Sequence, residues 1–153
     1  MSGPVLFCYD GSEGSKAALV AAAELVAHPA DAVVLTVWTP ATILLARGGS
    51  LGASYVPNEA QIDEEEAAAA QRIADEGAEG ARRRGYNASP RIAEAAESVP
   101  RTIAEVADEI DAGLIVCGQR GLGFVRSALL GSVSHAISAR AQRPVLIAPQ
   151  HER

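Results

Sequence analysis

The chain has few aromatic residues, few cysteines and no long hydrophobic run. Aromatic residues make up 4% of the 153 residues against 48% for all hydrophobic residues, so Ala, Val, Leu and Ile have to build the core, as in helices packed on a buried sheet. The two cysteines, Cys8 and Cys117, have neither a C-x-x-C spacing nor paired histidines, which disfavours a disulfide framework or a metal site built on cysteine. No apolar run approaches the roughly 18 residues of a membrane span, and the N-terminus has no signal-peptide core. We therefore expect a cytoplasmic protein with no membrane partner.

Positive charge is also scarce. Lys and Arg number 13 against 19 Asp and Glu, which gives a formal net charge of −6. Nucleic-acid affinity depends on neutralising many phosphates at once, so this charge balance argues against a nucleic-acid partner. A single small anion can still be held by local groups.

Short apolar runs alternate with helix-forming segments along the chain. Runs bounded by turn formers or rich in β-branched residues predict strands at residues 4–9, 32–38, 90–96, 113–117 and 145–148. Helix formers and apolar residues at helical spacing predict helices at residues 15–26, 61–84, 101–110 and 132–141. Residues 39–58 show no period, and we expect a long loop there.

This alternation predicts the fold class. Strand–helix–strand units form right-handed parallel crossovers, so residues 1–153 are expected to form one α/β domain. The expected architecture is a single open parallel five-stranded sheet with helices on both faces, Rossmann-like, in strand order 3-2-1-4-5. In such sheets, ligands bind beyond the carboxyl ends of the strands where the strand order reverses. Residues 9–12 and 117–121 would then flank one crevice.

A glycine-rich pattern follows the fourth predicted strand. Gly118-Gln119-Arg120-Gly121 is followed nine residues later by Gly131-Ser132-Val133-Ser134, where a helix should begin. Glycines allow backbone N–H groups to approach a phosphate closely, and a helix N-terminus adds unpaired donors and a positive dipole end. The hydroxyls of Ser132 and Ser134 add further donors. The pattern indicates a phosphate-binding segment.

Two common phosphate motifs are absent. Gly14-Ser15-Lys16 does not complete a P-loop, because G-x-x-x-x-G-K-[ST] needs glycine directly before the lysine. The first strand–helix turn has no G-x-G-x-x-G, which disfavours a dinucleotide enzyme of the usual Rossmann type. No Walker lysine, paired carboxylates or evident catalytic base follows Gly131, which disfavours a phosphoryl-transfer enzyme.

The full spacing resembles the universal stress protein family, whose ATP-binding members show G-x2-G-x9-G-[ST]. Gly118, Gly121, Gly131 and Ser132 match this motif. A first strand that ends in Asp10 and a closing segment RPVLIAP at residues 143–149 are also similar to the family. The resemblance covers residues 5–149.

The resemblance implies roles for individual residues. Asp10 would lie by an adenine nucleotide, ATP or else ADP or AMP, and by its Mg²⁺ ion, with capping of the following helix as the alternative role. Val37 would meet the adenine. Tyr9 departs from the family's pattern, because it places a bulky ring directly before Asp10, where it would change the shape of the pocket. The remaining positions would line the base and ribose (Cys117 and Gly118) or hold the phosphates (Gly121, Gly131, Ser132, Val133 and Ser134). Arg120 is not part of the motif, but as one of the nearest cations in sequence it would offset phosphate charge, unless it is simply an exposed surface arginine.

By the same resemblance, the protein would be a nucleotide-responsive stress or regulatory module with unknown protein partners. A homodimer is expected through the edge strand at residues 145–148, whose backbone groups would otherwise stay unpaired. Two alternatives remain: a slow ATPase or nucleotidyl-transfer enzyme that uses the same pocket, and a protein without nucleotide that acts through its surface. For Cys8 and Cys117 we expect inert core positions rather than reactive thiols.

Overall fold

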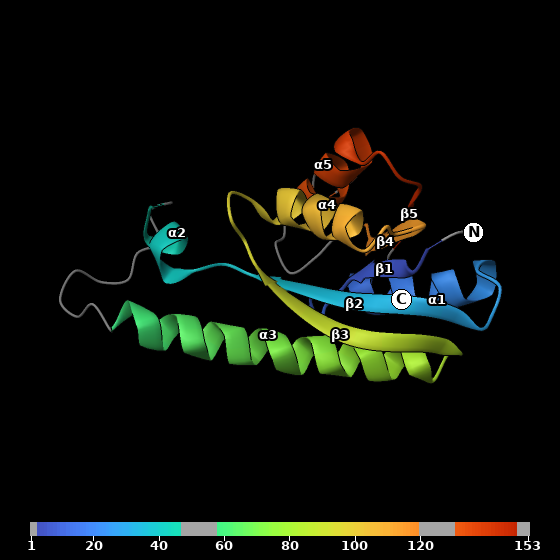
Figure 1. The fold of residues 1–153 in the computed structure, drawn as a ribbon, viewed down its shortest axis with the longest axis horizontal. Helices are drawn as coiled ribbons and strands as arrows, with labels where there is room; N and C mark the ends of the chain where they lie inside the picture. Colours follow the sequence, from blue (N-terminus) through green and yellow to red (C-terminus); the bar gives the residue numbers. More distant parts are fainter. Residues whose placement is uncertain (1–2, 47–57, 120–130, 150–153) are drawn as a thin grey trace.

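In a computed structural model, which describes residues 3–46, 58–119 and 131–149, five parallel strands form one sheet (Figure 1). Their order across the sheet is β3-β2-β1-β4-β5, and every neighbouring pair is parallel. The strands are β1 (Val5–Cys8), β2 (Ala30–Trp38), β3 (Tyr86–Glu94), β4 (Leu114–Gly118) and β5 (Val145–Ala148). The predicted fold class and strand order are therefore confirmed.

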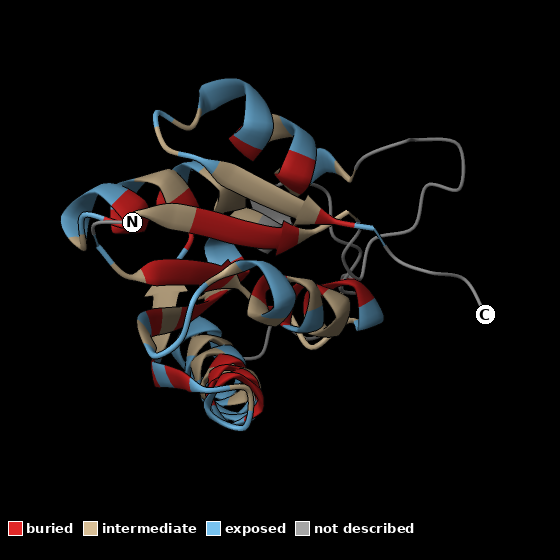
Figure 2. Cartoon of the chain, turned by 90° about the vertical axis from the view of Figure 1, so that its right-hand side faces the viewer, coloured by how far each residue is buried: buried red, intermediate tan, exposed pale blue. Residues whose placement is uncertain are grey.

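Helices cover both faces of this sheet. On one face, α1 (Glu13–Leu25) and α3 (Glu59–Arg82) pack against Val5 and Phe7 of β1. On the other face, α4 (Val99–Glu109) and α5 (Ser132–Arg140) pack against the neighbouring β1 residue, Leu6. The side chains of a strand point alternately to its two faces, so the central strand β1 supplies both halves of the core. Figure 2 shows this core as buried central strands flanked by the inner sides of the helices.

Two sequence predictions were wrong in this part of the chain. β3 begins at Tyr86, four residues before the predicted start at residue 90, because it pairs along the whole length of β2, from Ala30↔Tyr86 to Trp38↔Glu94. The region expected to be a loop contains a short helix, α2 (Ala41–Ala46). The backbone N–H of Ala41 donates to Asp63 Oδ1 of α3 at 2.7 Å, a tertiary cap that no local pattern reveals. The other boundaries agree within two residues.

Among the helices of the described ranges, none combines the length and hydropathy needed to cross a bilayer.

Candidate functional site

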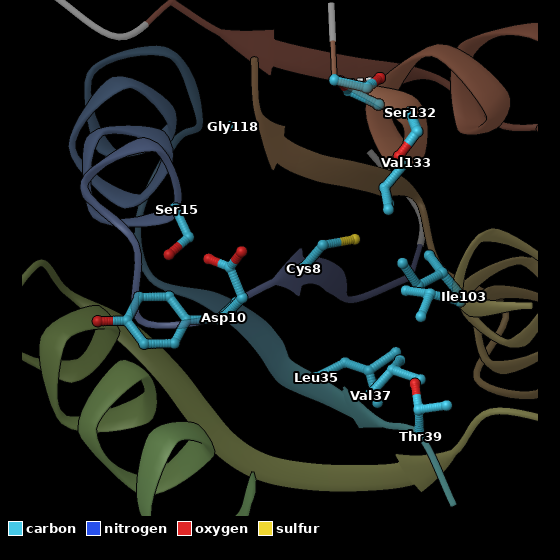
Figure 3. Close-up of a pocket in the computed structure, with 14 residues that line it drawn as sticks. Cys8, Asp10, Ser15, Leu35, Val37, Thr39, Ile103, Gly118, Ser132 and Val133 are labelled. Carbon is cyan, nitrogen blue, oxygen red and sulfur yellow. Dashed lines mark hydrogen bonds between the residues drawn. The ribbon is translucent and has the colours of Figure 1, made fainter. Parts of the chain in front are cut away.

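A cavity of about 460 Å³ opens at the carboxyl ends of β1, β2 and β4 (Figure 3). Its walls come from these strands and from the first turns of α1, α4 and α5. β1 lies between β2 and β4, so this is the point where the strand order reverses. The cavity thus occupies the position where open parallel sheets bind ligands.

The structure brings most of the predicted site residues together around this cavity. The residues that line it include Tyr9, Asp10, Val37, Gly118, Gly131, Ser132, Val133 and Ser134. Cys117 is not among them, because it is buried within β4 with 3% of its surface exposed. The predicted Arg120 and Gly121 lie outside the described residues.

One side of the cavity is apolar. Leu35 and Val37 of β2 face Val99 and Ile103 of α4, and the close-up shows Leu35, Val37 and Ile103 gathered together with Thr39 beside them. This wall offers no charged group, so it suits the face of a flat, largely apolar ring.

The opposite side is polar and centres on Asp10. Its carboxylate points into the cavity between Ser15 and Gly118, as Figure 3 shows. The backbone N–H of Ser12 donates to Asp10 Oδ1 at 3.0 Å, which fixes the side chain in a local turn. The N-cap of α1 is Ser12, whose Oγ accepts from the N–H of Ser15 at 3.2 Å. The capping role considered for Asp10 therefore belongs to Ser12.

Buried hydrogen bonds hold the chain where it leaves β1. The hydroxyl of Thr36, which is 5% exposed, donates to the carbonyl of Tyr9 at 2.8 Å. The N–H of Tyr9 donates to the carbonyl of Leu35 at 2.9 Å. Because both bonds tie this backbone to β2, they fix the direction in which the chain presents Asp10.

The Tyr9 hydroxyl is directed towards α3. It donates to Glu76 Oε1 at 2.9 Å, and its ring lies so close to Gly77 that a Cβ built there would be 2.7 Å from Cδ1 of the ring. Burial and the hydrogen bond to Glu76 raise the pKa of Tyr9 far above its ordinary value. Tyr9 thus shapes the cavity wall while its polar end is bound to α3.

The N-terminus of α5 closes the polar side. Its N-cap, Gly131, has no side chain that could accept from the first N–H groups of the helix. The hydroxyl of Ser134, 3% exposed, donates to the carbonyls of Gln119 at 2.9 Å and Gly131 at 3.0 Å. In this structure the Ser134 hydroxyl is thus bound to the helix end, whereas Ser132 is exposed, and the expected role of Ser134 in holding phosphate stays a prediction.

Cys8 was expected in the inert core, but it is half-buried and lines the cavity, with its sulfur turned inwards in Figure 3. Burial raises the pKa of the Cys8 thiol, and neighbouring Cys117 and Asp10 raise it further. Burial also raises the pKa of Cys117 to about 11. Both shifts favour the neutral thiol, which is the less reactive form.

Sequence reasoning missed six lining residues: Cys8, Ser15, Leu35, Thr39, Val99 and Ile103. Leu35 and Thr39 could have been predicted, because they lie two positions before and after Val37, and every second side chain of a strand points to the same face. Ile103 and Val99 share one face of α4, but nothing local tells which face meets the cavity.

The charge of the cavity comes from one group. Asp10 is the single charged side chain among the described residues that line it. The described part of the chain contains no group of three or more His, Cys, Asp or Glu residues that could hold a metal ion. A metal ion at Asp10 would therefore need the oxygens of a bound ligand or water to complete its coordination.

These features define an open parallel α/β protein with a ligand cavity at its topological switch point. Residues 1–149 match the Universal stress protein family, and the chain belongs to that family.

Solved structures show the same fold. The hypothetical protein MJ0577 is 18% identical, with a TM-score of 0.79 over 100% of this chain and 99% of that one. A universal stress protein in complex with cAMP is 23% identical, with a TM-score of 0.65 over 97% and 98% of the two chains. The universal stress protein from Archaeoglobus fulgidus in complex with dAMP is 22% identical, with a TM-score of 0.59 over 95% and 97%. A comparison with curated proteins finds no match.

Proposed function

We propose that this protein binds an adenine nucleotide, with ATP as the first candidate, in the cavity at the end of β1. The observation that carries the proposal is the pairing of an apolar wall, made by Leu35, Val37 and Ile103, with the N-terminus of α5 in one cavity. A nucleotide needs both surfaces, one for its ring and one for its phosphates. The structural relatives in complex with cAMP and dAMP support this assignment.

In this proposal, the adenine lies against Val37 and the phosphates lie at the α5 N-terminus. The N–H groups of Ser132 and Val133 and the Ser132 hydroxyl donate to phosphate oxygens. Gly131 leaves room for a phosphate to approach, and the motif assigns Gly121 to the same end. Arg120, one of the nearest cations in sequence, would offset phosphate charge there. The Ser134 hydroxyl stabilises the start of α5 through its hydrogen bonds to the carbonyls of Gln119 and Gly131.

Asp10 would otherwise repel a phosphate chain, since no described lining residue carries a positive charge. We propose that it binds Mg²⁺, directly or through water, together with phosphate oxygens of the nucleotide. The ion then turns the carboxylate from a repulsive group into a binding group.

We further propose that the protein is a nucleotide-responsive regulatory module that works as a homodimer in the cytoplasm. β5 is an edge of the sheet, and Val145, Leu146 and Ile147 are each only partly buried in the single chain. A second copy pairing at this edge would cover them. Light scattering of the purified protein tests this, and an Ile147→Lys variant that stays dimeric would contradict pairing through β5.

The nucleotide proposal is tested by isothermal titration of ATP, ADP and AMP into nucleotide-stripped protein, with and without Mg²⁺. Gly131 has φ −66° and ψ 159°, a conformation open to β-branched residues, so Gly131→Val places a side chain at the phosphate end without backbone strain. Ser138→Val puts the same side chain on the exposed side of α5 and is the matched control. We expect one site per chain in the wild type and the control, and none in Gly131→Val. A folded wild type that binds no adenine nucleotide would overturn the proposal.

A further inference from the structure

A second cavity, of about 210 Å³, lies between α1 and α3. It shares Tyr9 with the nucleotide cavity, but its other lining residues are different: Lys16, Leu19, Glu76, Gly80, Arg83 and Arg84. The geometry points to a binding site for a phosphate dianion, either inorganic phosphate or the phosphate group of a monoester.

This cavity is positively charged, whereas the whole chain is negatively charged. Lys16, Arg83 and Arg84 bring three positive charges and Glu76 one negative charge, a formal net charge of +2, in a chain of −6. The negative charge is already engaged, because Glu76 Oε1 accepts from the Tyr9 hydroxyl at 2.9 Å and lies 3.8 Å from Lys16 Nζ. Lys16 Nζ also lies 3.5 Å from Glu13 Oε1, outside the lining, so the two arginine charges are the ones left for an anion.

The guanidinium groups of Arg83 and Arg84 border the same space, which is where a side chain at Gly80 would lie. A Cβ built on Gly80 would lie 3.8 Å from Arg84 Nη1 and 3.9 Å from Arg83 Nη2. Arg84 is held in place, because its Nη1 donates to the Gly80 carbonyl at 2.8 Å. The backbone N–H of Arg83 donates to the Glu79 carbonyl, but its guanidinium forms no hydrogen bond or ion pair with the described residues and so remains available to a ligand.

Gly80 itself fits this interpretation. It is buried in the last turn of α3, where glycine is still less favourable than alanine. A methyl group there would project into the space that the two arginines border and would also press on Leu19 Cδ1 at 3.3 Å. The missing side chain therefore keeps the cavity open.

Size and geometry select the ligand. At about 30 Å³ per water, the cavity holds about seven water volumes, which is ample for a phosphate group but small for a nucleotide. Arginine forks match the oxygens of phosphate in two parallel hydrogen bonds, and the Lys16 ammonium adds a point charge. A phosphate dianion satisfies both the size and the charge of the site.

The test is an NMR titration of the full chain with inorganic phosphate at constant ionic strength, with chloride as the reference anion. Saturating shifts are expected at the backbone amides of Lys16, Gly80, Arg83 and Arg84, distinct from any at residues 131–134. Glycerol 3-phosphate forms the second arm: tighter binding than inorganic phosphate would identify a monoester, and equal or weaker binding would identify free phosphate.

Variants make the test decisive. Arg83→Gln removes one charge from the cavity without breaking a side-chain hydrogen bond or ion pair among the described residues, and it should weaken phosphate binding about tenfold. Arg72→Gln makes the same change at an exposed position of α3 outside the cavity and should leave the affinity unchanged. Shifts confined to residues 131–134, or equal affinities in the wild type and Arg83→Gln, would overturn the proposal. Shifts at residues 131–134 are followed separately, so this phosphate site can be rejected whether or not the nucleotide cavity binds its ligand.

Discussion

The Cα of Gly118, at the end of β4, lies directly against the backbone of Gly14 in the first turn of α1. A Cβ built on Gly118 would be 2.5 Å from the Gly14 carbonyl carbon and 2.6 Å from its oxygen. Gly118 belongs to the glycine pattern that predicted a phosphate site, yet this contact gives it a packing role: it lets the first helix approach the sheet beside the cavity. Gly118 thus serves the site by allowing α1 to pack close to the end of β4.

Gly118→Ala should therefore destabilise the fold. The obstructing atoms are backbone, so the methyl group fits only if α1 moves, and overpacking of this kind costs about 1–3 kcal/mol. Urea unfolding measures the loss. Gly131→Ala is the control, since its φ of −66° is open to alanine, and it should cost less than about 1 kcal/mol as a weaker N-cap. Equal stabilities of Gly118→Ala and the wild type would show that α1 can move freely.

The two thiols predict how stability depends on pH. The pKa values of Cys8 and Cys117 are raised in the folded protein, mainly by burial. The unfolded chain therefore loses these protons first, and the stabilisation is complete below the unfolded pKa of about 8.5 and declines as the pH rises above it. Each thiol contributes a slope of up to about 1.4 kcal/mol per pH unit.

Urea unfolding between about pH 8 and 10 under reducing conditions checks this prediction, because the lower limit lies below the thiol pKa and the upper limit is where tyrosines begin to ionise. The Cys8→Ala, Cys117→Ala double variant should be less stable at neutral pH but show a flatter profile across this window. A wild-type free energy of unfolding that stays constant up to pH 10 would contradict the raised thiol pKa values.

Much of the fold followed from local patterns. The apolar runs that became β1 and β4 end in turn formers, and their alternation with helices left few topologies, so the order of the five strands and the location of the cavity could be predicted. Asp10 and Gly131 fell at that location because each comes directly after a strand or directly before a helix. The positions of Asp10 and Gly131 follow from the ends of the predicted strands and helices, which can be recognised in the sequence from the spacing of apolar residues.

The remaining features depend on contacts between distant residues. α2 has its first N–H capped by Asp63, which is 22 positions further along the chain. The hydroxyl of Ser134 reaches back 15 positions to the Gln119 carbonyl and so ties the start of α5 to the end of β4. Gly118 matched a phosphate motif, but its close contact is with Gly14. None of these partners can be identified before the elements are assembled.

The two described tyrosines should respond oppositely to loss of the hydroxyl. Tyr9 donates to Glu76, so Tyr9→Phe should destabilise the protein by about 1 kcal/mol. The Tyr86 hydroxyl is buried and has no hydrogen-bond partner among the described residues, so Tyr86→Phe should be neutral or stabilise by up to about 1 kcal/mol. Each variant is the other's control for the Tyr→Phe change. Thermal or urea unfolding distinguishes them, and two variants that shift stability in the same direction would be inconsistent with these contacts.

The proposed role of Asp10 is separable from its structural role by Asp10→Asn. Asparagine keeps an oxygen that can accept from the Ser12 N–H, so the turn after β1 should persist. With Mg²⁺ present, the variant should bind ATP more weakly than the wild type, because it loses the carboxylate that binds the ion. Without Mg²⁺ the order should reverse, since the described cavity lining would no longer carry a negative charge facing the phosphates. Titration calorimetry in both conditions measures the crossover, and a variant weaker than the wild type in both would mean that Asp10 contacts the nucleotide itself rather than the metal.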